Sequence, residues 1–508
     1  MTLTVVKKNI IANFVGSGCS ALLSLVLIPV YIRVLGIEAW GVIGLFASLQ
    51  SLAYLVDLGL SATLNREMAR LSIQKESAQE MRNLVRTFEL IYWAFALAIG
   101  SVIFVLAPLI AHRWLRSNQV SPEIISNAFR LMGVALTFQW PFTLYSGGLM
   151  GLQRQVLLNA INASVAIFRS VGAVLILWLV SPTLEAFFLW QVLASLLNTC
   201  LAGLCLWGSL PHTGRRSGFQ RELLQRRWRF AVGMSGIVVM SIILTQMDKI
   251  ILSRLLSLRM FGYYVLAASV ATSLYLLVLP VFYSLYPRFT QLVSLGELEG
   301  LKEIYHHGCQ LMSILILPAT MIVVFFSRQI LLVWTSDPAT VANTYLVLNI
   351  LIAGAALNGL MHLPHALQLA HGWTRQLLYL SVVSALALIP LLIFTTSRYG
   401  TVGAALTLVI LNGGVAIVNI QLMHRRLLKG EQWRWYLVDV GLPLMVALAS
   451  ALLCRAVLPA QIQRLHMILA LAAISLFVVG STALATPVIR SNLISFFRRN
   501  ERGIVKAS

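Results

Sequence analysis

The stretch Q-M-D-K-I-I-L-S-R-L-L-S-L-R-M-F-G-Y-Y-V-L-A-A-S, residues 246–269, places charged side chains within or against an otherwise apolar run. Asp248, Lys249 and Arg254 are the charges of its first apolar run. On insertion scales a charged residue at the centre of a membrane helix costs about 2.5–3.5 kcal/mol. Each of the three therefore requires a partner, a water-filled cavity or a position at the membrane surface.

The same stretch resembles the segment V-L-G-I-E-A-W-G-V-I-G-L-F-A-S at residues 34–48, which also joins two apolar runs. An alignment without gaps places Gly41 on Gly262 and Trp40 on Phe261. Ala47 and Ser48 fall on the A-S pair at 268–269. The alignment predicts that the chain begins the same helical hairpin twice.

The composition predicts a polytopic membrane protein. Of the 508 residues, 59% are hydrophobic and 11% are charged, whereas a soluble protein carries about 25% charged residues. The apolar runs are about 20 residues long and lack the alternation of a barrel strand, so we expect an all-α fold. About 14 transmembrane helices are predicted, near 9–34, 41–66, 86–111, 125–149, 155–181, 184–208, 229–254, 260–287, 307–327, 341–369, 374–397, 401–424, 437–457 and 463–485.

The net charge of +21 comes from basic residues in short loops between these spans. Such loops set membrane topology, and they do not indicate nucleic-acid binding. Most loop Lys and Arg residues lie on the side of the N-terminus, so we expect both termini in the cytoplasm. The five cysteines all lie in apolar runs without paired spacing, so neither a disulfide framework nor a metal site is expected.

The most basic loop, residues 209–228, separates the first six spans from the next six. Because six is an even number of spans, the chain returns to the side on which it began, and both lobes start on the same side of the membrane. We therefore expect two six-helix lobes, 1–208 and 229–425, in a parallel pseudo-twofold repeat about an axis along the membrane normal. Two further helices occupy 437–485, and a basic cytoplasmic tail covers 486–508. We expect the basic residues of these segments to set the orientation of the protein in the membrane and to contact anionic lipid.

Arg169 lies about 14 residues into its span, which at 1.5 Å per residue is close to the bilayer centre. It either forms an ion pair with a neighbouring helix or faces an anionic substrate in a cavity. Arg130 either reaches back to the membrane surface or lines the same cavity. Asp57 and Asp248 either pair with a basic residue, bind a coupling cation or carry a proton. Asp248 and Lys249 point about 100° apart on a helix and do not pair with each other.

The span 341–369 contains Asn358, His362 and His365 at roughly helical spacing. We interpret them as a polar cavity face in preference to a metal site or a proton relay. Tyr283 and Tyr286 suit an interfacial aromatic belt better than a sugar platform. The chain contains no nucleophile–base set at motif spacing, no H-E-x-x-H and no P-loop, and these absences argue against an enzyme.

Three segments of the chain resemble the sequences of a known protein family. They are N-F-V-G with L-I-P-V-Y-I-R-V-L-G-I-E-A-W-G (13–41), D-L-G-L-S-A-T-L-N-R-E (57–67), and M-D-K-I-I-L-S-R-L-L-S with F-G-Y-Y-V-L-A (247–267). Together they resemble the O-antigen (Wzx-type) polysaccharide-export flippases of the multidrug/oligosaccharidyl-lipid/polysaccharide exporter superfamily. The resemblance covers the first two helices of each lobe.

The resemblance implies a flippase that moves an undecaprenyl-pyrophosphate-linked oligosaccharide across a bacterial inner membrane for surface polysaccharide such as lipopolysaccharide. It implies a cationic cavity between the lobes, with no cofactor and with H⁺ or Na⁺ as the candidate coupling ion. Membrane lipids, a polysaccharide polymerase and a chain-length regulator are the implied partners. The expected cavity residues are Asp57, Arg130, Arg169, Asp248, Lys249, Asn358, His362 and His365, and the expected cytoplasmic entrance residues are Arg66 and Arg288.

Two other functions remain open at this point. An ion-coupled multidrug or cation antiporter of the same superfamily is the first, although no carboxylate lies between Asn9 and Arg33 in the first span. A membrane polymerase or ligase is the second. Such an enzyme is expected to have a sizeable outer loop with clustered charges, and the outer segments 112–124 and 328–340 are short.

Overall fold

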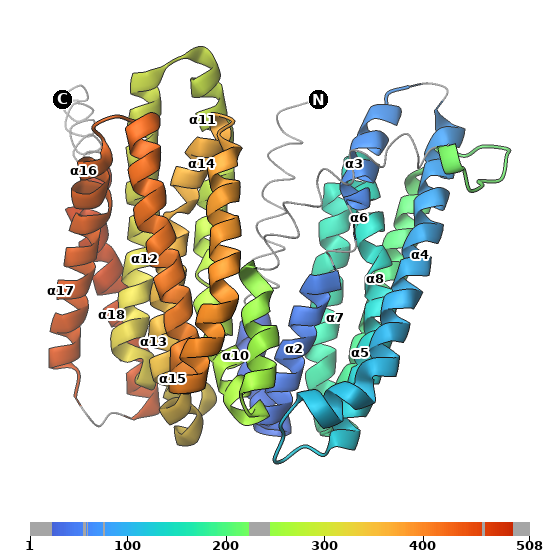
Figure 1. The fold of residues 1–508 in the computed structure, drawn as a ribbon, viewed down its shortest axis with the longest axis horizontal. Helices are drawn as coiled ribbons and strands as arrows, with labels where there is room; N and C mark the ends of the chain where they lie inside the picture. The colour runs from blue at the N-terminus through green and yellow to red at the C-terminus, as the bar shows by residue number, and fades with distance from the viewer. Residues whose placement is uncertain are drawn as a thin grey trace, which may run out of the picture. The chain divides into compact units, whose positions relative to one another are not determined.

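The computed structural model describes residues 23–53, 57, 59–74, 77–222, 244–459 and 463–490, and every regular element in these ranges is a helix (Figure 1). The all-α fold class is therefore confirmed. The chain divides into two compact units between Val265 and Leu266.

The first unit begins with a short apolar helix, Leu23–Leu35. It continues with α2 (Ile37–Ala53), α3 (Leu60–Leu71), α4 (Ala78–Leu109) with its π-helical end η2 (Ile110–Trp114), α5 (Pro122–Gln139), α6 (Pro141–Gly151), α7 (Gln155–Leu179), α8 (Leu184–Ser209), a helix at 244–255 and the start of α10 (Leu258–Thr272).

The local sequence explains where α5 begins. Ser121 caps α5 by accepting a hydrogen bond from the Ile124 N–H at 3.3 Å, and Pro122 occupies the first helical position.

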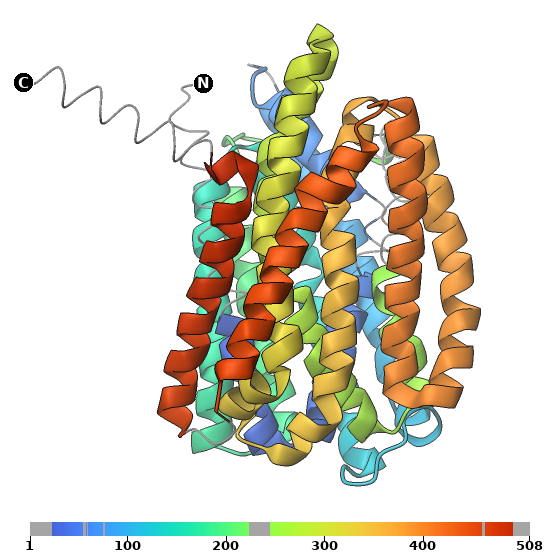
Figure 2. The ribbon, with the colours of Figure 1, turned by 90° about the vertical axis from the view of Figure 1, so that its left-hand side faces the viewer.

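The second unit consists of the end of α10 and the helices that follow it. These are α11 (Tyr275–Leu295), α12 (Leu298–Thr335), α13 (Pro338–Leu360), α14 (His362–Ala370), α15 (Thr374–Arg426), α16 (Gln432–Arg434), η3 (Trp435–Gly441), α17 (Leu442–Val457) and α18 (Arg464–Ala485). Figure 2 shows α17 and α18 beside α12.

Nine helices of the described residues are long and apolar enough to cross a membrane. One of them, α15, is two spans joined by a turn. Two others, Leu258–Leu295 and Pro338–Ala370, each consist of two successive helices, α10 with α11 and α13 with α14. The remaining spans are shorter helices or pairs of them, namely Leu23–Leu35, α2 with α3, α5 with α6, and 244–255. Each of the fourteen predicted spans thus contains helix. The predicted boundaries of two spans were too narrow, because α4 and α12 start well before 86 and 307.

The turn inside α15 is a single residue. Gly400 has φ 57° and ψ −138°, which is a conformation that favours glycine. Thr395 and Thr407 share a hydrogen bond of 2.7 Å near this turn, and Gln376 donates to Asn419 at 3.2 Å near the opposite end. The two halves of α15 therefore pack against each other as an antiparallel hairpin.

The two glycines that the repeat aligns lie against each other's helices. A Cβ atom added at Gly262 would lie 2.2 Å from the Ile37 carbonyl oxygen of α2. One added at Gly41 would lie 3.0 Å from the Leu258 carbonyl oxygen of α10. The close approach of α2 and α10 thus depends on the absence of side chains at these two positions.

We expect Gly262→Ala to lower the free energy of unfolding by about 1–3 kcal/mol, because the clash is with backbone and cannot be relieved by a rotamer change. The measurement is the unfolding midpoint of the purified protein in detergent. Gly414→Ala is the matched control, since nothing lies within 4 Å of its added Cβ atom. Alanine there should be neutral or stabilising by about 0.5–1 kcal/mol. Equal midpoints for the two variants would contradict a tight α2–α10 contact.

Candidate functional site

Two neighbouring spans are broken in each unit. In the first unit the breaks separate α2 from α3 and α5 from α6, and α3 lies against α6. In the second unit they separate α10 from α11 and α13 from α14, and α11 lies against α14. Broken helices at membrane depth are tolerated only inside protein or beside water, and they often form binding sites. The second and fourth spans of each predicted lobe are the broken ones.

Asp57 lies in the break between α2 and α3. Its carboxylate accepts a hydrogen bond from Ser61 at 2.8 Å and another from the Tyr92 hydroxyl. Tyr92 is buried and stacks on Trp140, which is the residue at the break between α5 and α6. The two breaks of this unit are thus joined through one carboxylate and two aromatic rings. No arginine or lysine in the described part of the chain forms an ion pair with Asp57.

A second link joins the same broken spans. The Gln50 amide on α2 donates to the Gln139 side-chain oxygen at the end of α5, at 2.6 Å. Neither glutamine was predicted as a site residue, although both are uncharged polar residues in apolar runs and could have been identified on that ground.

The break in the second unit carries Asn358, His362 and His365. The Tyr275 hydroxyl at the start of α11 donates to the Asn358 side-chain oxygen at 3.0 Å. His362 Nδ1 lies 3.0 Å from the Asn358 carbonyl oxygen, and its ring lies 5.7 Å from that of Tyr275. His365 is half-buried on α14. Tyr275 was not predicted, and it joins this group.

Asp248, Lys249 and Arg254 have separate partners. Asp248 is 4% exposed and accepts a hydrogen bond from the buried Tyr264 hydroxyl at 2.8 Å. Lys249 donates to Thr245 and Gln246 of its own helix, both at 3.3 Å. The structure therefore places Asp248 and Lys249 with different partners.

Arg254 completes this set of charges. Its guanidinium donates to the Arg113 carbonyl oxygen at 2.5 Å and lies 6.0 Å from the Trp114 ring centre. The carbonyls at the end of η2 thus supply the partner that this arginine requires at the end of its span.

The predicted arginines differ in their surroundings. Arg169 is half-buried on α7. Arg130 is half-buried on α5 and lies 5.5 Å from the centre of the Phe104 ring. Arg66 on α3 and Arg288 on α11 are exposed, and Arg288 donates to Gln291 at 3.2 Å.

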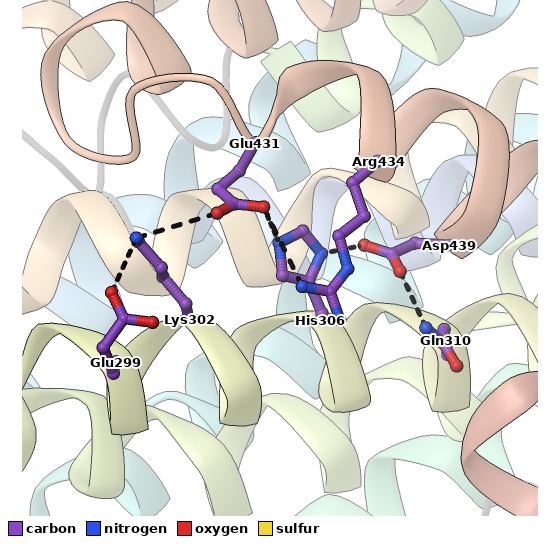
Figure 3. Close-up of polar contacts among 7 residues, drawn as sticks. All are labelled: Glu299, Lys302, His306, Gln310, Glu431, Arg434 and Asp439. Atoms are coloured by element: carbon purple, nitrogen blue, oxygen red, sulfur yellow. Dashed lines mark hydrogen bonds and ion pairs between the residues drawn. The ribbon is translucent and has the colours of Figure 1, made fainter.

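A buried polar network was missed entirely (Figure 3). His306 of α12 lies between two carboxylates, with Nδ1 bonded to Asp439 and Nε2 3.2 Å from Glu431. Gln310 donates to the other Asp439 oxygen at 2.9 Å and accepts from the Val488 N–H at 3.2 Å. His306 and Asp439 are fully buried. The network therefore fastens the C-terminal helices to α12.

The predicted linker is held on α4. Asn83 accepts from the Gly218 N–H at 3.1 Å, and Thr87 accepts from the Gln220 N–H at 3.0 Å. Gln79 donates to the Arg216 carbonyl oxygen at 3.2 Å. One polar face of α4 thus binds the backbone of the basic loop. Among the described residues, no group of three or more His, Cys, Asp or Glu side chains is arranged to hold a metal ion.

An all-helical chain with paired, broken spans that carry buried polar groups has the architecture of a membrane transporter. The family described as "Polysaccharide biosynthesis protein" matches residues 6–293. The chain belongs to this family, and the resemblance drawn from its helix-starting motifs is confirmed.

Comparisons with individual proteins agree with the family. The chain is 22% identical over 400 residues to a Shigella flexneri protein named "Putative O-antigen transporter", covering 79% of this chain and 93% of the relative. Its fold is similar to that of a lipid II flippase, MurJ, with a TM-score of 0.72, 12% identity and coverage of 94% and 99% of the two chains. It is also similar to an inward-facing multidrug transporter of the MATE family, with a TM-score of 0.68, 14% identity and coverage of 80% and 94%. The chain is thus a multi-pass membrane protein that belongs to this family and shares its fold with these transporters.

Proposed function

We propose that this protein moves an undecaprenyl-pyrophosphate-linked oligosaccharide from the cytoplasmic to the periplasmic leaflet of a bacterial inner membrane. The match to a polysaccharide biosynthesis family over more than half of the chain carries the proposal. The relative named as an O-antigen transporter supports it. The translocated lipid-linked oligosaccharide would then be used in surface polysaccharide assembly, where a polymerase and a chain-length regulator would be the later partners.

The chemistry of such a substrate requires a protein route. A pyrophosphate and a chain of sugars cannot cross hydrocarbon unaided, because their charges and hydroxyls lose their water. In the proposed mechanism two six-helix lobes, 1–208 and 229–425, alternate in access. Arg169 and Lys249 would neutralise the head group, with Arg130 beside them. Arg66 and Arg288 would attract it at the cytoplasmic entrance, and both termini would lie on that side.

The direct test uses purified protein in vesicles that contain lipid-linked oligosaccharide extracted from a producing strain. We expect an added glycan-cleaving enzyme to reach the oligosaccharide of both leaflets when the protein is present. In protein-free vesicles it should reach only the outer-leaflet share. The same exposure in both preparations would contradict the proposed translocation.

An ion-coupled antiporter is the second candidate, and the MATE-like fold together with the buried carboxylates favours it. In either case H⁺ or Na⁺ is the proposed coupling ion. Asp248 is the carboxylate to test, because it is buried and its second oxygen has no hydrogen-bond partner in the described part of the chain.

We expect Asp248→Asn to keep the unfolding midpoint, because the amide oxygen still accepts the Tyr264 hydrogen bond, and to lose gradient-driven export. Export is measured as surface polysaccharide, and folding as the midpoint in detergent. Tyr264→Phe is the matched control: it removes the hydroxyl and should lower stability, since the buried carboxylate then lacks its donor. Unchanged export in Asp248→Asn cells would rule out a coupling role for this residue.

A further inference from the structure

One face of α11 carries a row of aromatic side chains that the proposed charge contacts do not use. Tyr275, Phe282 and Tyr286 are 7 and 4 residues apart, so they lie on the same face of the helix. The row is about 16 Å long at 1.5 Å per residue. All three side chains are partly exposed. The row is therefore longer than a single sugar ring.

The rings of this row are aligned with one another. The ring planes of Phe282 and Tyr286 are 5° apart with centroids 5.8 Å apart. The His362 ring of α14 lies 6.0 Å from Phe282 and 5.7 Å from Tyr275. His362 thus lies close to both Tyr275 and Phe282.

Polar groups with unused hydrogen-bonding capacity lie beside these rings. The Asn358 side-chain oxygen is occupied by the Tyr275 hydroxyl, and in the described part of the chain its NH₂ group has no acceptor. His362 Nδ1 is bonded to the Asn358 carbonyl oxygen, so the accessible Nε2 atom is available as an acceptor. The site therefore presents both a donor and an acceptor next to flat apolar surfaces.

We propose that Tyr275, Phe282, Tyr286, Asn358 and His362 bind a sugar ring of the transported oligosaccharide; this inference rests on the proposed function. A pyranose has apolar C–H faces, which suit ring stacking, and hydroxyls that both donate and accept. An interfacial aromatic belt explains the row less well. Tyr275 and Asn358 lie at the helix breaks in the middle of the spans Leu258–Leu295 and Pro338–Ala370, whereas belt residues lie at head-group level.

The experiment compares two ligands of the purified, full-length protein in detergent. The first is undecaprenyl pyrophosphate without sugar, and the second is the same lipid carrying the oligosaccharide extracted from a producing strain. Affinity is measured by ligand-induced change in intrinsic fluorescence. Wild-type protein should bind the glycosylated lipid more tightly than the bare lipid.

Phe282→Leu keeps an apolar side chain and removes the ring face. We expect it to bind the glycosylated lipid about tenfold more weakly, which corresponds to the energy of one aromatic contact, and to bind the bare lipid as wild type does. Tyr275→Phe keeps the ring and removes the hydroxyl that orients Asn358, and it should lose glycan affinity by a smaller factor. Tyr379→Leu is the matched control, because Tyr379 is 68% exposed on α15 and lies outside the row.

The outcomes separate the two proposals. If wild type binds neither lipid, the proposed function itself is rejected. If it binds both lipids equally, or if Phe282→Leu binds the glycosylated lipid as wild type does, only the sugar site is rejected. The sugar site would also be rejected if Phe282→Leu lowered the affinity for both lipids equally. It would likewise be rejected if Tyr379→Leu lowered the affinity for the glycosylated lipid.

Discussion

Replacement of Arg169 by alanine is expected to abolish surface polysaccharide while protein level and membrane insertion stay normal. Arg169 is the one charged residue in the sequence of α7, and it lies about 21 Å along the helix from Gln155, near the middle of this 25-residue helix. An arginine there is costly unless it faces protein, water or an anion. In the proposed mechanism, removing it leaves the proposed pyrophosphate head group without its counter-charge, and the head group should no longer enter the proposed cavity.

Two further variants make this result specific. Arg169→Lys should retain part of the activity, because it keeps the charge and loses the planar two-pronged donor. Arg398→Ala is the matched control. Arg398 is exposed and lies 4.9 Å from the Phe394 ring centre, so its loss removes an arginine without touching α7. Wild-type polysaccharide in Arg169→Ala cells would leave Arg169 with a structural role only.

Asp439→Asn is expected to cause the largest loss of stability. His306 and Asp439 are both fully buried, and asparagine at 439 removes one of the two carboxylates that hold His306, leaving only the longer contact with Glu431. Breaking such a pair costs about 3–5 kcal/mol. The unfolding midpoint in detergent should fall, and the fluorescence of Trp435, which is buried beside this network, should change first.

A double variant separates pairing from packing. His306→Leu combined with Asp439→Leu removes both members of the buried pair, and it should be more stable than Asp439→Asn alone, because neither member is left without the other. Glu299→Gln is the control within the same network, since Glu299 is 85% exposed and its ion pair with Lys302 is solvated. If the double variant were no more stable than Asp439→Asn, the buried charge pair would not explain the loss.

Much of the fold could be predicted from the sequence, because length and hydropathy determine which runs can cross a bilayer. The alignment of Gly41 with Gly262 predicted a repeated hairpin but not that the two glycines lie where α2 and α10 meet, which is a matter of tertiary packing. The break at Trp140 was not predicted, because it lies within a single apolar run and hydropathy does not distinguish a straight helix from two short ones. The break at Met361 lies one turn before Pro364, and a proline inside the span 341–369 predicts a kink there.

The partners of the candidate site residues could be predicted only in part. Helical geometry correctly separated Asp248 from Lys249, but it could not identify Tyr264 as the donor. His306 was overlooked for a different reason. The predicted span began at 307, so His306 was assigned to a loop, whereas α12 starts at Leu298 and His306 meets Asp439 across 133 residues of sequence. A contact at that separation depends on tertiary packing, which one sequence does not reveal.

The hairpin of α15 constrains how the protein is synthesised. Its two spans are joined at Gly400 with no loop between them, and a Cβ atom on Gly403 would lie 2.1 Å from the Thr395 carbonyl oxygen. Only the short polar stretch T-T-S-R-Y-G-T, residues 395–401, therefore separates the first span from the second as the chain emerges from the ribosome. We expect the insertion machinery to release residues 374–426 into lipid together, as one preassembled element.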